Sequence, residues 1–304
     1  MIRIGDVELS RVEELYTPAF TPTDLLPDWT REAVAPYMSW LAPEYYDPAL
    51  DQLIMTSQSW VIRTSRHTVL VDTCIGNGKE RPDSAPLFHR AELPYLANLA
   101  AAGVHPEAVD FVMCTHLHTD HVGWNTRLAD GRWVPTFPNA RYVFSETDLV
   151  ALRDGSGPVS HPDDARIYAD SVLPVIETGQ AMLVKGAEEV AGVLTIEPTP
   201  GHTAGHIAGR LASRGQQALF VGDAIHHPIQ VYQPDWSTSF CEDPALARAT
   251  RRSILEEAAE TGLLLCPAHF AGGYCGTVSR QGAGYAYASH GHAHGLAGRR
   301  SLAS

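Results

Sequence analysis

The sequence predicts an α/β fold in which two β-sheets pack against each other and helices flank them. Strand-like apolar runs recur in both halves of the 304-residue chain, and segments with helical periodicity lie between them. The composition is typical of a globular chain with a large core, since 44% of the residues are hydrophobic and 19% are charged. Layered folds of this size often form one unit, so we expect one structural domain.

Four strands and two helices are predicted in the first half of the chain. The strands are expected over residues 57–63, 68–72, 109–114 and 141–144, and the helices over residues 92–101 and 147–153. The short turn SRH between the first two strands indicates a hairpin.

The second half repeats this pattern and adds one long helix. Strands are expected over residues 194–198, 206–211, 217–221 and 263–266. Residues 244–261 predict an amphipathic helix, because Leu246, Ile254 and Leu255 can share one side while charged residues lie elsewhere.

The two ends of the chain differ from the centre. Residues 1–50 contain segments rich in proline and aromatic residues, and we expect an extension packed on the core that serves as a lid or as the arm of a homodimer. Residues 51–280 are expected to form the main domain and residues 281–304 a flexible tail. Alternating histidines in this tail, His290, His292 and His294, suit a solvated terminal segment better than a metal site.

Charge and cysteine content exclude several classes of protein. The formal charge of −13 argues against a nucleic-acid partner, which would require a basic surface. Five cysteines without a CxxC pair argue against a disulfide framework or a zinc ribbon and favour a reducing compartment. The start MIRIGDVELS lacks the apolar core of a signal peptide, and no stretch approaches the ~20 apolar residues of a membrane span. We therefore expect a cytoplasmic protein without membrane contact.

Histidine and aspartate gather where the predicted strands end. HLHTDH at 116–121 follows one strand, and His202, Asp223 and His269 follow later ones. Polar groups crowded at buried strand ends each need a partner, and a bound cation meets that need for all of them at once. Imidazole and carboxylate ligands suit zinc and similar divalent ions. The predicted metal ligands are His116, His118, Asp120, His121, His202, Asp223 and His269.

These motifs resemble those of the metallo-β-lactamase superfamily of metallohydrolases. The resemblance is carried by HLHTDH at 116–121, GH at 201–202, GD at 222–223 and AH at 268–269, with LVDT at 70–73 similar to the family's early aspartate motif. It extends over residues 55 to 272 or so and implies a four-layer αββα sandwich with metal ions at one edge of the two sheets. Residues 51–280 would then be the catalytic domain.

The resemblance also implies a role for each ligand. His116, His118 and His202 would hold a first ion, and Asp120, His121 and His269 a second. Asp223 would bridge the two ions, and Asp72 would orient the site. The expected cofactors are two divalent ions, with Zn²⁺ favoured and Fe, Mn or Co as alternatives. Such a pair would supply a hydroxide nucleophile near neutral pH, while Asp120 holds the nucleophile and passes a proton to the leaving oxygen.

Within the superfamily the chain most resembles the lactonase and methyl parathion hydrolase-like group. The features are CTHLHTDHVGWNT, GRWVPTFPNARYVFS and GDAIHH. His226 stands where quorum-quenching lactonases often carry a tyrosine, and it resembles the methyl parathion hydrolase branch there. His226 either donates a hydrogen bond to a substrate oxygen or is a loop histidine near the site.

Aromatic residues in loops after the ligand motifs are candidates for contact with a small-molecule substrate, or for packing in the core or a lid. They are Trp124, Phe137, Tyr232, Trp236 and Phe240.

The leading hypothesis is a hydrolase with two metal ions that cleaves an ester or a lactone. One alternative is phosphotriester hydrolysis. Another is an oxidoreductase similar to the persulfide dioxygenases, which use a single iron on ligands that correspond to His116, His202 and Asp223.

Overall fold

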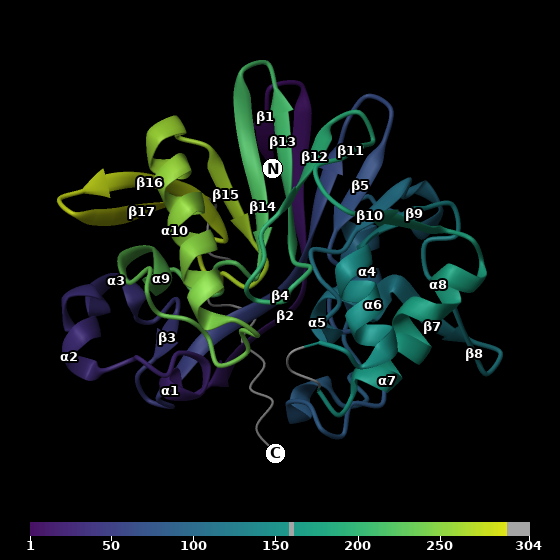
Figure 1. Cartoon of the computed structure of the whole chain (residues 1–304), viewed down its shortest axis with the longest axis horizontal. Coiled ribbons are helices and arrows are strands. Elements are labelled where there is room, and N and C mark those ends of the chain that lie inside the picture. The colour runs from purple at the N-terminus through teal and green to yellow at the C-terminus, as the bar shows by residue number, and fades with distance from the viewer. Residues whose placement is uncertain (158–160, 291–304) are drawn as a thin grey trace.

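Two mixed β-sheets face each other and helices cover their outer sides (Figure 1). The computed structural model describes residues 1–157 and 161–290 of the chain. An apolar core lies between the sheets, with Trp60, Met113 and Phe220 among its fully buried members. Further clusters pack each sheet against its helices. The four-layer αββα sandwich predicted from the sequence is confirmed.

The first sheet has the strand order β1-β2-β4-β5-β6-β9-β10, with β3 paired to β4. Its strands are β1 (Ile2–Ile4), β2 (Val7–Phe20), β3 (Tyr46–Asp47), β4 (Gln52–Arg63), β5 (Thr68–Val71), β6 (Phe111–Met113), β9 (Arg141–Ser145) and β10 (Ala181–Val184). Strands β4 and β5 form the predicted hairpin, and β5, β6, β9 and β10 run parallel. The segments that follow β5 and β6 therefore start from the same edge of the sheet.

The second sheet has the order β11-β12-β13-β14-β15-β16-β17. Its strands are β11 (Glu189–Val190), β12 (Leu194–Pro198), β13 (Ile207–Ser213), β14 (Gln216–Gly222), β15 (Leu264–Pro267), β16 (Cys275–Gln281) and β17 (Gly284–His290). Strands β14 and β15 are parallel, so Asp223 and His269 follow them at one edge. A separate hairpin joins β7 (Thr126–Ala129) to β8 (Arg132–Pro135).

Helices cover both sides of the sandwich. On the first sheet lie α4 (Tyr95–Ala101), α6 (Glu146–Asp154), α7 (Asp164–Ile167) and α8 (Leu173–Glu177), with the π-helix η5 (Tyr168–Val172) between the last two. The second sheet is covered by α10 (Pro244–Thr261), which has the predicted bounds. Asp243 caps its first turn by accepting hydrogen bonds from two backbone N–H groups, and Gly262 ends it with a left-handed φ of 68°.

One predicted helix begins later than expected. Residues 92–101 are helical only from Tyr95 onward. Pro94 accounts for this difference, because the residue before a proline is disfavoured in the helical conformation.

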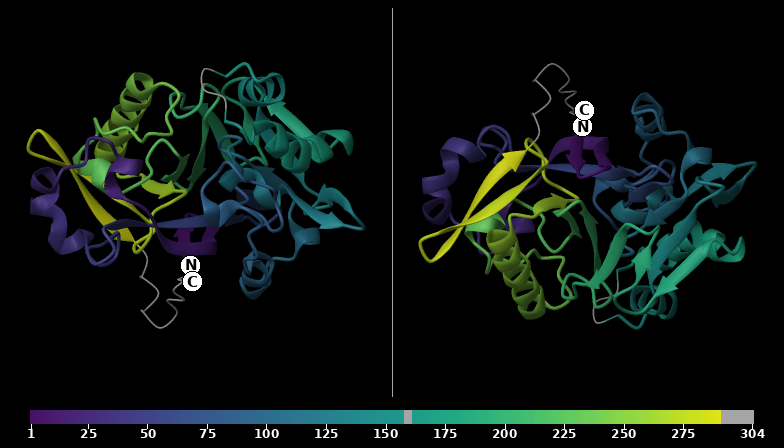
Figure 2. Two further views of the ribbon diagram at one scale, coloured as in Figure 1. Left: turned by 90° about the horizontal axis from the view of Figure 1, so that it is seen from below. Right: turned by 90° about the horizontal axis from the view of Figure 1, so that it is seen from above.

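The N-terminal region combines strands of the first sheet with short helices. Strand β2 pairs with β4 over most of its length, so this part of the predicted extension is built into the sheet. The segments α1 (Pro22–Leu25), α2 (Arg31–Val34), η1 (Ala35–Tyr37) and α3 (Met38–Leu41) follow. They lie beside α9 (Ile229–Tyr232) and the β16–β17 hairpin (Figures 1 and 2).

The C-terminal region is more ordered than the sequence suggests. The prediction of a flexible tail from residue 281 is wrong for residues 284–290, which form β17 along the whole of β16. His290 ends this strand, while His292 and His294 lie outside the described residues. No helix in residues 1–157 or 161–290 has the length and apolar character needed to cross a bilayer.

Candidate metal centre

Side chains from both sheets meet at the edge where β6, β14 and β15 end. HLHTDH follows β6 and enters the short helix α5 (Thr119–Val122). His202 comes from the loop between β12 and β13, and Asp223 and His269 follow β14 and β15. The ligand atoms gather within 4.8 Å of one another in overlapping groups of three. The structure thus brings all seven predicted ligands together.

The first trio consists of His116, His118 and His202. Nδ1 of His118 lies 2.9 Å from Nε2 of His116 and 2.9 Å from Nε2 of His202, and these two Nε2 atoms are 3.2 Å apart. A triangle of ring nitrogens cannot be satisfied by hydrogen bonds among neutral imidazoles, because each ring has one N–H. The triangle suits three lone pairs directed at one cation.

The second trio consists of Asp120, His121 and His269. Nε2 of His121 lies 3.2 Å from Nε2 of His269, and Oδ2 of Asp120 lies 3.8 Å and 3.5 Å from these two atoms. This is a mixed nitrogen and oxygen set of the kind that binds divalent first-row ions.

Asp223 lies between the two trios. Its Oδ2 is 3.3 Å from Nε2 of His202, and its Oδ1 is 3.1 Å from Nε2 of His269. Oδ1 is buried and makes no well-directed hydrogen bond among the described residues, although Nε2 of His269 and Nε2 of His121 lie 3.1 and 3.4 Å away. An unpartnered buried carboxylate oxygen is costly unless a cation binds it. The donor set around Asp223 therefore fits divalent metal binding.

Burial keeps the first trio in the form that binds metal. It lowers the pKa of His118 to about 4 and the pKa values of His116 and His202 well below the usual range of histidine. Neutral imidazole has the lone pair that a metal ion requires. These rings need no deprotonation near neutral pH to act as ligands.

Groups behind the second trio fix its ring orientations. Asp72, which has a left-handed φ of 60°, accepts a hydrogen bond from the backbone N–H of Thr115 at 2.7 Å. Its other carboxylate oxygen lies 3.0 Å from Nδ1 of His121. Nδ1 of His269 lies 2.8 Å from the carbonyl oxygen of Thr56. Both histidines are therefore held with Nε2 directed at the centre.

His226 is a buried neighbour of Asp223. Its Nε2 lies 3.0 Å from Oδ2 of Asp223, and the ring faces the cavity above the centre. Gln230 holds the loop in place, because its side-chain oxygen accepts hydrogen bonds from the backbone N–H groups of His226 and His227.

A cavity of about 570 Å³ opens above the centre. His118, Asp120, His202, Asp223 and His269 lie on its wall. Apolar side chains line much of the rest, including Leu15, Phe20, Leu87, Phe88, Leu152 and Phe240. Phe20 and Phe240 meet edge to face with ring centroids 5.5 Å apart, and 47% of Phe240 is exposed.

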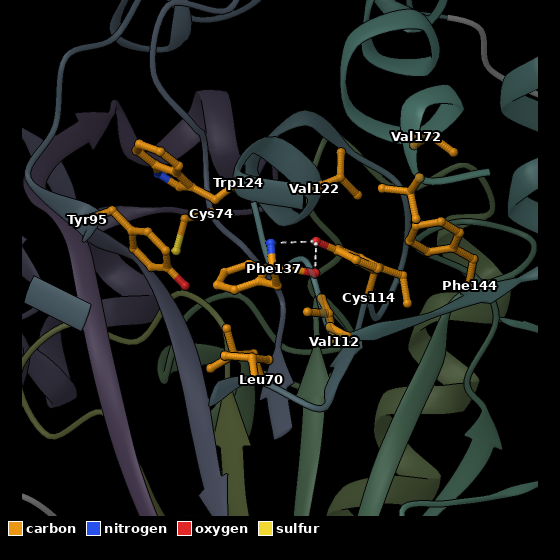
Figure 3. Packing of buried hydrophobic residues seen from close by; sticks show 14 of the residues in the cluster. Leu70, Cys74, Tyr95, Val112, Cys114, Val122, Trp124, Phe137, Phe144 and Val172 are labelled. Atoms are coloured by element: carbon orange, nitrogen blue, oxygen red, sulfur yellow. Dashed lines mark hydrogen bonds between the residues drawn. The ribbon is translucent and has the colours of Figure 1, made fainter. Parts of the chain in front are cut away.

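Four of the predicted substrate-contacting aromatics do not line this cavity. Trp124 and Phe137 are buried in the core beneath the first sheet's helices (Figure 3). Trp124 stacks on Tyr95, and its Nε1 donates to Glu14. Tyr232 and Trp236 pack with the N-terminal helices instead. Loop position alone does not distinguish an inward-facing aromatic from one that meets a ligand.

Several buried polar residues near the centre have no obvious signal in the sequence. Glu14 accepts hydrogen bonds from the backbone of Ile75 and Gly76, and Asp148 accepts from the loop that carries His202. Arg81 is fully buried beside α5. His206, whose Nε2 accepts from the backbone N–H of Asp223, is the exception, since it lies in the TPGHTAGH motif.

Solved structures share this fold. A hydrolase of the β-lactamase superfamily named AbOPH matches with a TM-score of 0.79 at 22% identity, over 95% of this chain and 96% of that chain. A probable metal-dependent hydrolase from Staphylococcus aureus matches with a TM-score of 0.76 at 18% identity, over 95% and 99%. AidC, a dizinc quorum-quenching lactonase, matches with a TM-score of 0.74 at 20% identity, over 95% and 96%.

The fold and the histidine–aspartate centre define the class of a metal-dependent hydrolase. The family model of the metallo-β-lactamase superfamily matches residues 55–269, well over half of the chain. The chain therefore belongs to the metallo-β-lactamase superfamily. No curated protein sequence matches the chain.

Proposed function

We propose that this protein is a dinuclear metallohydrolase that cleaves a lactone or ester carrying an apolar group. The observation that carries the proposal is the position of Asp223 between two ligand trios, at the wall of a largely apolar cavity. Zn²⁺ is the favoured ion because the donors are imidazoles and carboxylates without thiolates.

Two ions at this centre would supply a hydroxide near neutral pH and polarise the substrate oxygen. The residues of the chain would then orient the reacting groups and transfer protons. Asp120 lies on the cavity wall with part of its side chain exposed, so it can accept a hydrogen bond from the nucleophile and later deliver a proton to the leaving oxygen. The hydroxyl of a ring-opened lactone or the alcohol of an ester would take that proton.

His226 is the second residue proposed to act on the substrate. It faces the cavity beside Asp223. Its Nδ1 has no hydrogen-bond partner in the described part of the chain, while its Nε2 lies 3.0 Å from Oδ2 of Asp223. A protonated ring nitrogen here can donate to the substrate carbonyl oxygen as negative charge develops on it. Asn or Gln at this position would keep a donor, whereas Ala would remove it.

The apolar wall supports an uncharged substrate group. Phe20 and Phe240 close one side of the cavity, and no lysine or arginine lines it among the described residues. A lactone or ester with an acyl or aryl group would bury apolar surface there. The likeness to the lactonase AidC is in keeping with this substrate class.

A phosphotriester is the second candidate substrate, because it is also uncharged and would bind its phosphoryl oxygen in the same place. The presence of His226, as in the methyl parathion hydrolase branch that the sequence resembles, favours testing it. A single-iron oxidoreductase is less well supported, since the second trio is complete.

Elemental analysis followed by a substrate panel tests the proposal. We expect about two divalent ions per chain and turnover of lactones or aryl esters, with or without phosphotriesters. Oxygen consumption with a persulfide substrate and one iron per chain would contradict it.

The state of the cysteines is the basis for a proposal about the cellular compartment. All five cysteines are free and buried. This arrangement suits a reducing compartment such as the cytoplasm.

A further inference from the structure

A buried cluster of charged side chains lies against the start of helix α5. Lys79 and Arg81 are fully buried, and Asp170 is the one carboxylate within 4 Å of either cation in the described part of the chain. Burial lowers the pKa of Lys79 to about 7. Well-packed apolar side chains would often be as stable as such a cluster. Stability alone therefore does not account for it.

The guanidinium of Arg81 has a fixed orientation. Nη1 and Nη2 donate to the two carboxylate oxygens of Asp170 at 2.8 and 2.7 Å. A planar guanidinium held at two points has its plane and the directions of its other N–H groups set. One of these groups, Nε–H, donates to Oγ1 of Thr119 at 2.8 Å. The Arg81–Asp170 pair thus fixes the Thr119 hydroxyl.

Asp170 is itself anchored. Ser171 Oγ donates to Oδ1 of Asp170 at 2.6 Å, and Lys79 Nζ donates to the backbone carbonyl of Asp170 at 3.0 Å. Asp170 belongs to the π-helix η5, a widened type of turn that is frequent at functional sites. The hydrogen bond to Thr119 therefore acts from a rigid point of the fold.

Thr119 is the first residue of α5 and directly precedes Asp120. Both side chains lie on the cavity wall, and Oδ2 of Asp120 is 3.5 Å from Nε2 of His269. A small displacement of this turn would move the Asp120 carboxylate away from the other members of the second trio. We propose that Arg81, held by Asp170, is a positioning residue that sets the Asp120 carboxylate through the Thr119 hydroxyl.

This inference rests on the proposed function, because it concerns the second ion of the proposed pair. The test uses the full-length, zinc-loaded protein and the variant Thr119→Val, which has the same shape but no hydroxyl. We expect the variant to bind the second zinc ion about tenfold more weakly or worse and to lose kcat by a similar factor, with KM little changed. Thr119→Ser, which keeps the hydroxyl, should restore both. Dialysis against graded concentrations of chelator, followed by elemental analysis, measures how tightly each zinc ion is bound. Steady-state kinetics measures kcat and KM.

Two further variants separate positioning from general loosening. Arg81→Lys keeps a positive charge but loses the pair of hydrogen bonds to Asp170, so it should weaken binding of the second ion as Thr119→Val does. Thr178→Val removes a hydroxyl just after α8 that contacts Val175 and Gln180 but neither Asp170 nor Thr119, and it should retain both ions and wild-type kcat.

The outcomes are distinct. Two tightly bound ions and unchanged kcat in Thr119→Val would overturn the proposal. Loss of an ion and of kcat in Thr178→Val to the same extent as in Thr119→Val would overturn it too. A wild-type protein that hydrolyses none of the substrate panel, while Thr119→Val still loses one of two ions, would retain the positioning role and reject the proposed substrate class. A wild-type protein that binds one ion would overturn both.

Discussion

The two ligand trios differ in what stands behind them. In the first trio, Nδ1 of His116 lies 3.2 Å from the hydroxyl of Thr115, and Nδ1 of His202 lies 3.9 Å from the thiol of Cys241. Both partners are neutral, and the second contact is long. In the second trio, Asp72 contacts His121, and the Arg81–Asp170 pair reaches Thr119 beside Asp120. Buried charges therefore contact the second trio or the residue next to it. Behind the first trio they act at one remove, from Asp72 through the Thr115 hydroxyl and from Asp148 through the loop that carries His202.

This difference predicts that metal binding at the two trios responds unequally to mutation of the residues behind them. A change in a buried charge several ångströms from the centre should weaken the second ion and leave the first in place, because charged hydrogen bonds orient ligands more strongly than neutral ones. Changes to the neutral partners behind the first trio should have small effects. The experiments below test this contrast, beginning with the ligands themselves.

Removal of a ligand from either trio should have the largest effect. His202→Ala and Asp120→Ala are each expected to reduce kcat/KM to about a thousandth of the wild-type value or less with every substrate, since the proposed ions and the proposed proton-transferring carboxylate would act as one reaction unit. Elemental analysis should show which ion each variant loses. Full turnover by either purified, metal-loaded variant would refute the assignment of the centre.

Asp72→Asn is expected to have the next largest effect. Asparagine tolerates the left-handed backbone at this position, but its NH₂ group would face Nδ1 of His121. His121 would then carry its proton on Nε2, the atom that must bind the ion. We expect about 10- to 100-fold weaker binding of the second ion and a smaller change at the first, which Asp72 reaches only through Thr115. Competition with a coloured chelator measures both affinities.

Two matched variants sharpen that experiment. Asp110→Asn changes a partly exposed carboxylate that accepts from the backbone of Thr68, and it should leave both affinities unchanged. Cys241→Ser alters the long contact behind His202, and we expect less than about a threefold change at the first ion. If Asp72→Asn and Cys241→Ser lost metal affinity by similar factors, there would be no contrast between the trios.

The sequence predicted which histidines and aspartates gather at the centre because their signal is local. HLHTDH occupies six consecutive residues, and His202, Asp223 and His269 follow apolar strands whose ends meet at one sheet edge. The supporting charges were not predicted, because Glu14 and Arg81 look like ordinary surface charges in the sequence. Their partners are distant in the chain: Arg81 is 89 residues from Asp170, and Glu14 is 61 residues from Ile75.

Tertiary pairing also explains the missed strands. Residues 284–290 are small and aromatic with few aliphatic side chains, and they become a strand by pairing with β16. Trp124 and Phe137 were predicted to contact substrate because they lie in loops after ligand motifs. The indole of Trp124 instead satisfies the buried Glu14, and Phe137 fills the core. The local sequence does not reveal which way either side chain points.

Glu14 offers a stability test on the side of the second trio. It occupies a β-bulge of β2, and its carboxylate accepts from the segment after Asp72 and from Trp124. Burial raises the pKa of Glu14 to about 7 from 4.5. The folded state therefore binds this proton more tightly than the unfolded state, so the stabilisation is present below about pH 4.5 and is lost as pH rises through 7.

Glu14→Gln should remove this pH dependence. The free energy of unfolding of the wild-type protein, relative to the variant, should fall by roughly 1–3 kcal/mol between pH 4.5 and 7.5. Urea denaturation of both proteins under identical metal conditions measures the difference. Glu107→Gln, on the surface, is the control. A relative stability that rises over this range would contradict the inferred environment of Glu14.

The smallest expected effect concerns Phe240, on the side of the first trio. The loop of Phe240 leads into residue 242, whose backbone N–H donates to the carbonyl of His202, and Ser239 in the same loop donates to the backbone of Leu25. The ring of Phe240 is half exposed at the cavity and touches Phe20. Phe240→Ala should therefore raise KM for substrates with a long apolar group by about fivefold, equivalent to about 1 kcal/mol of lost burial, and leave kcat and both ions unchanged. Leu246→Ala, at an exposed apolar position of α10 outside the cavity, should change neither parameter. An equal rise in KM for short and long substrates would mean that Phe240 holds its loop in place and does not contact the apolar group of the substrate. Loss of the first ion would show that the first trio, which includes His202, depends on its surroundings as strongly as the second trio does.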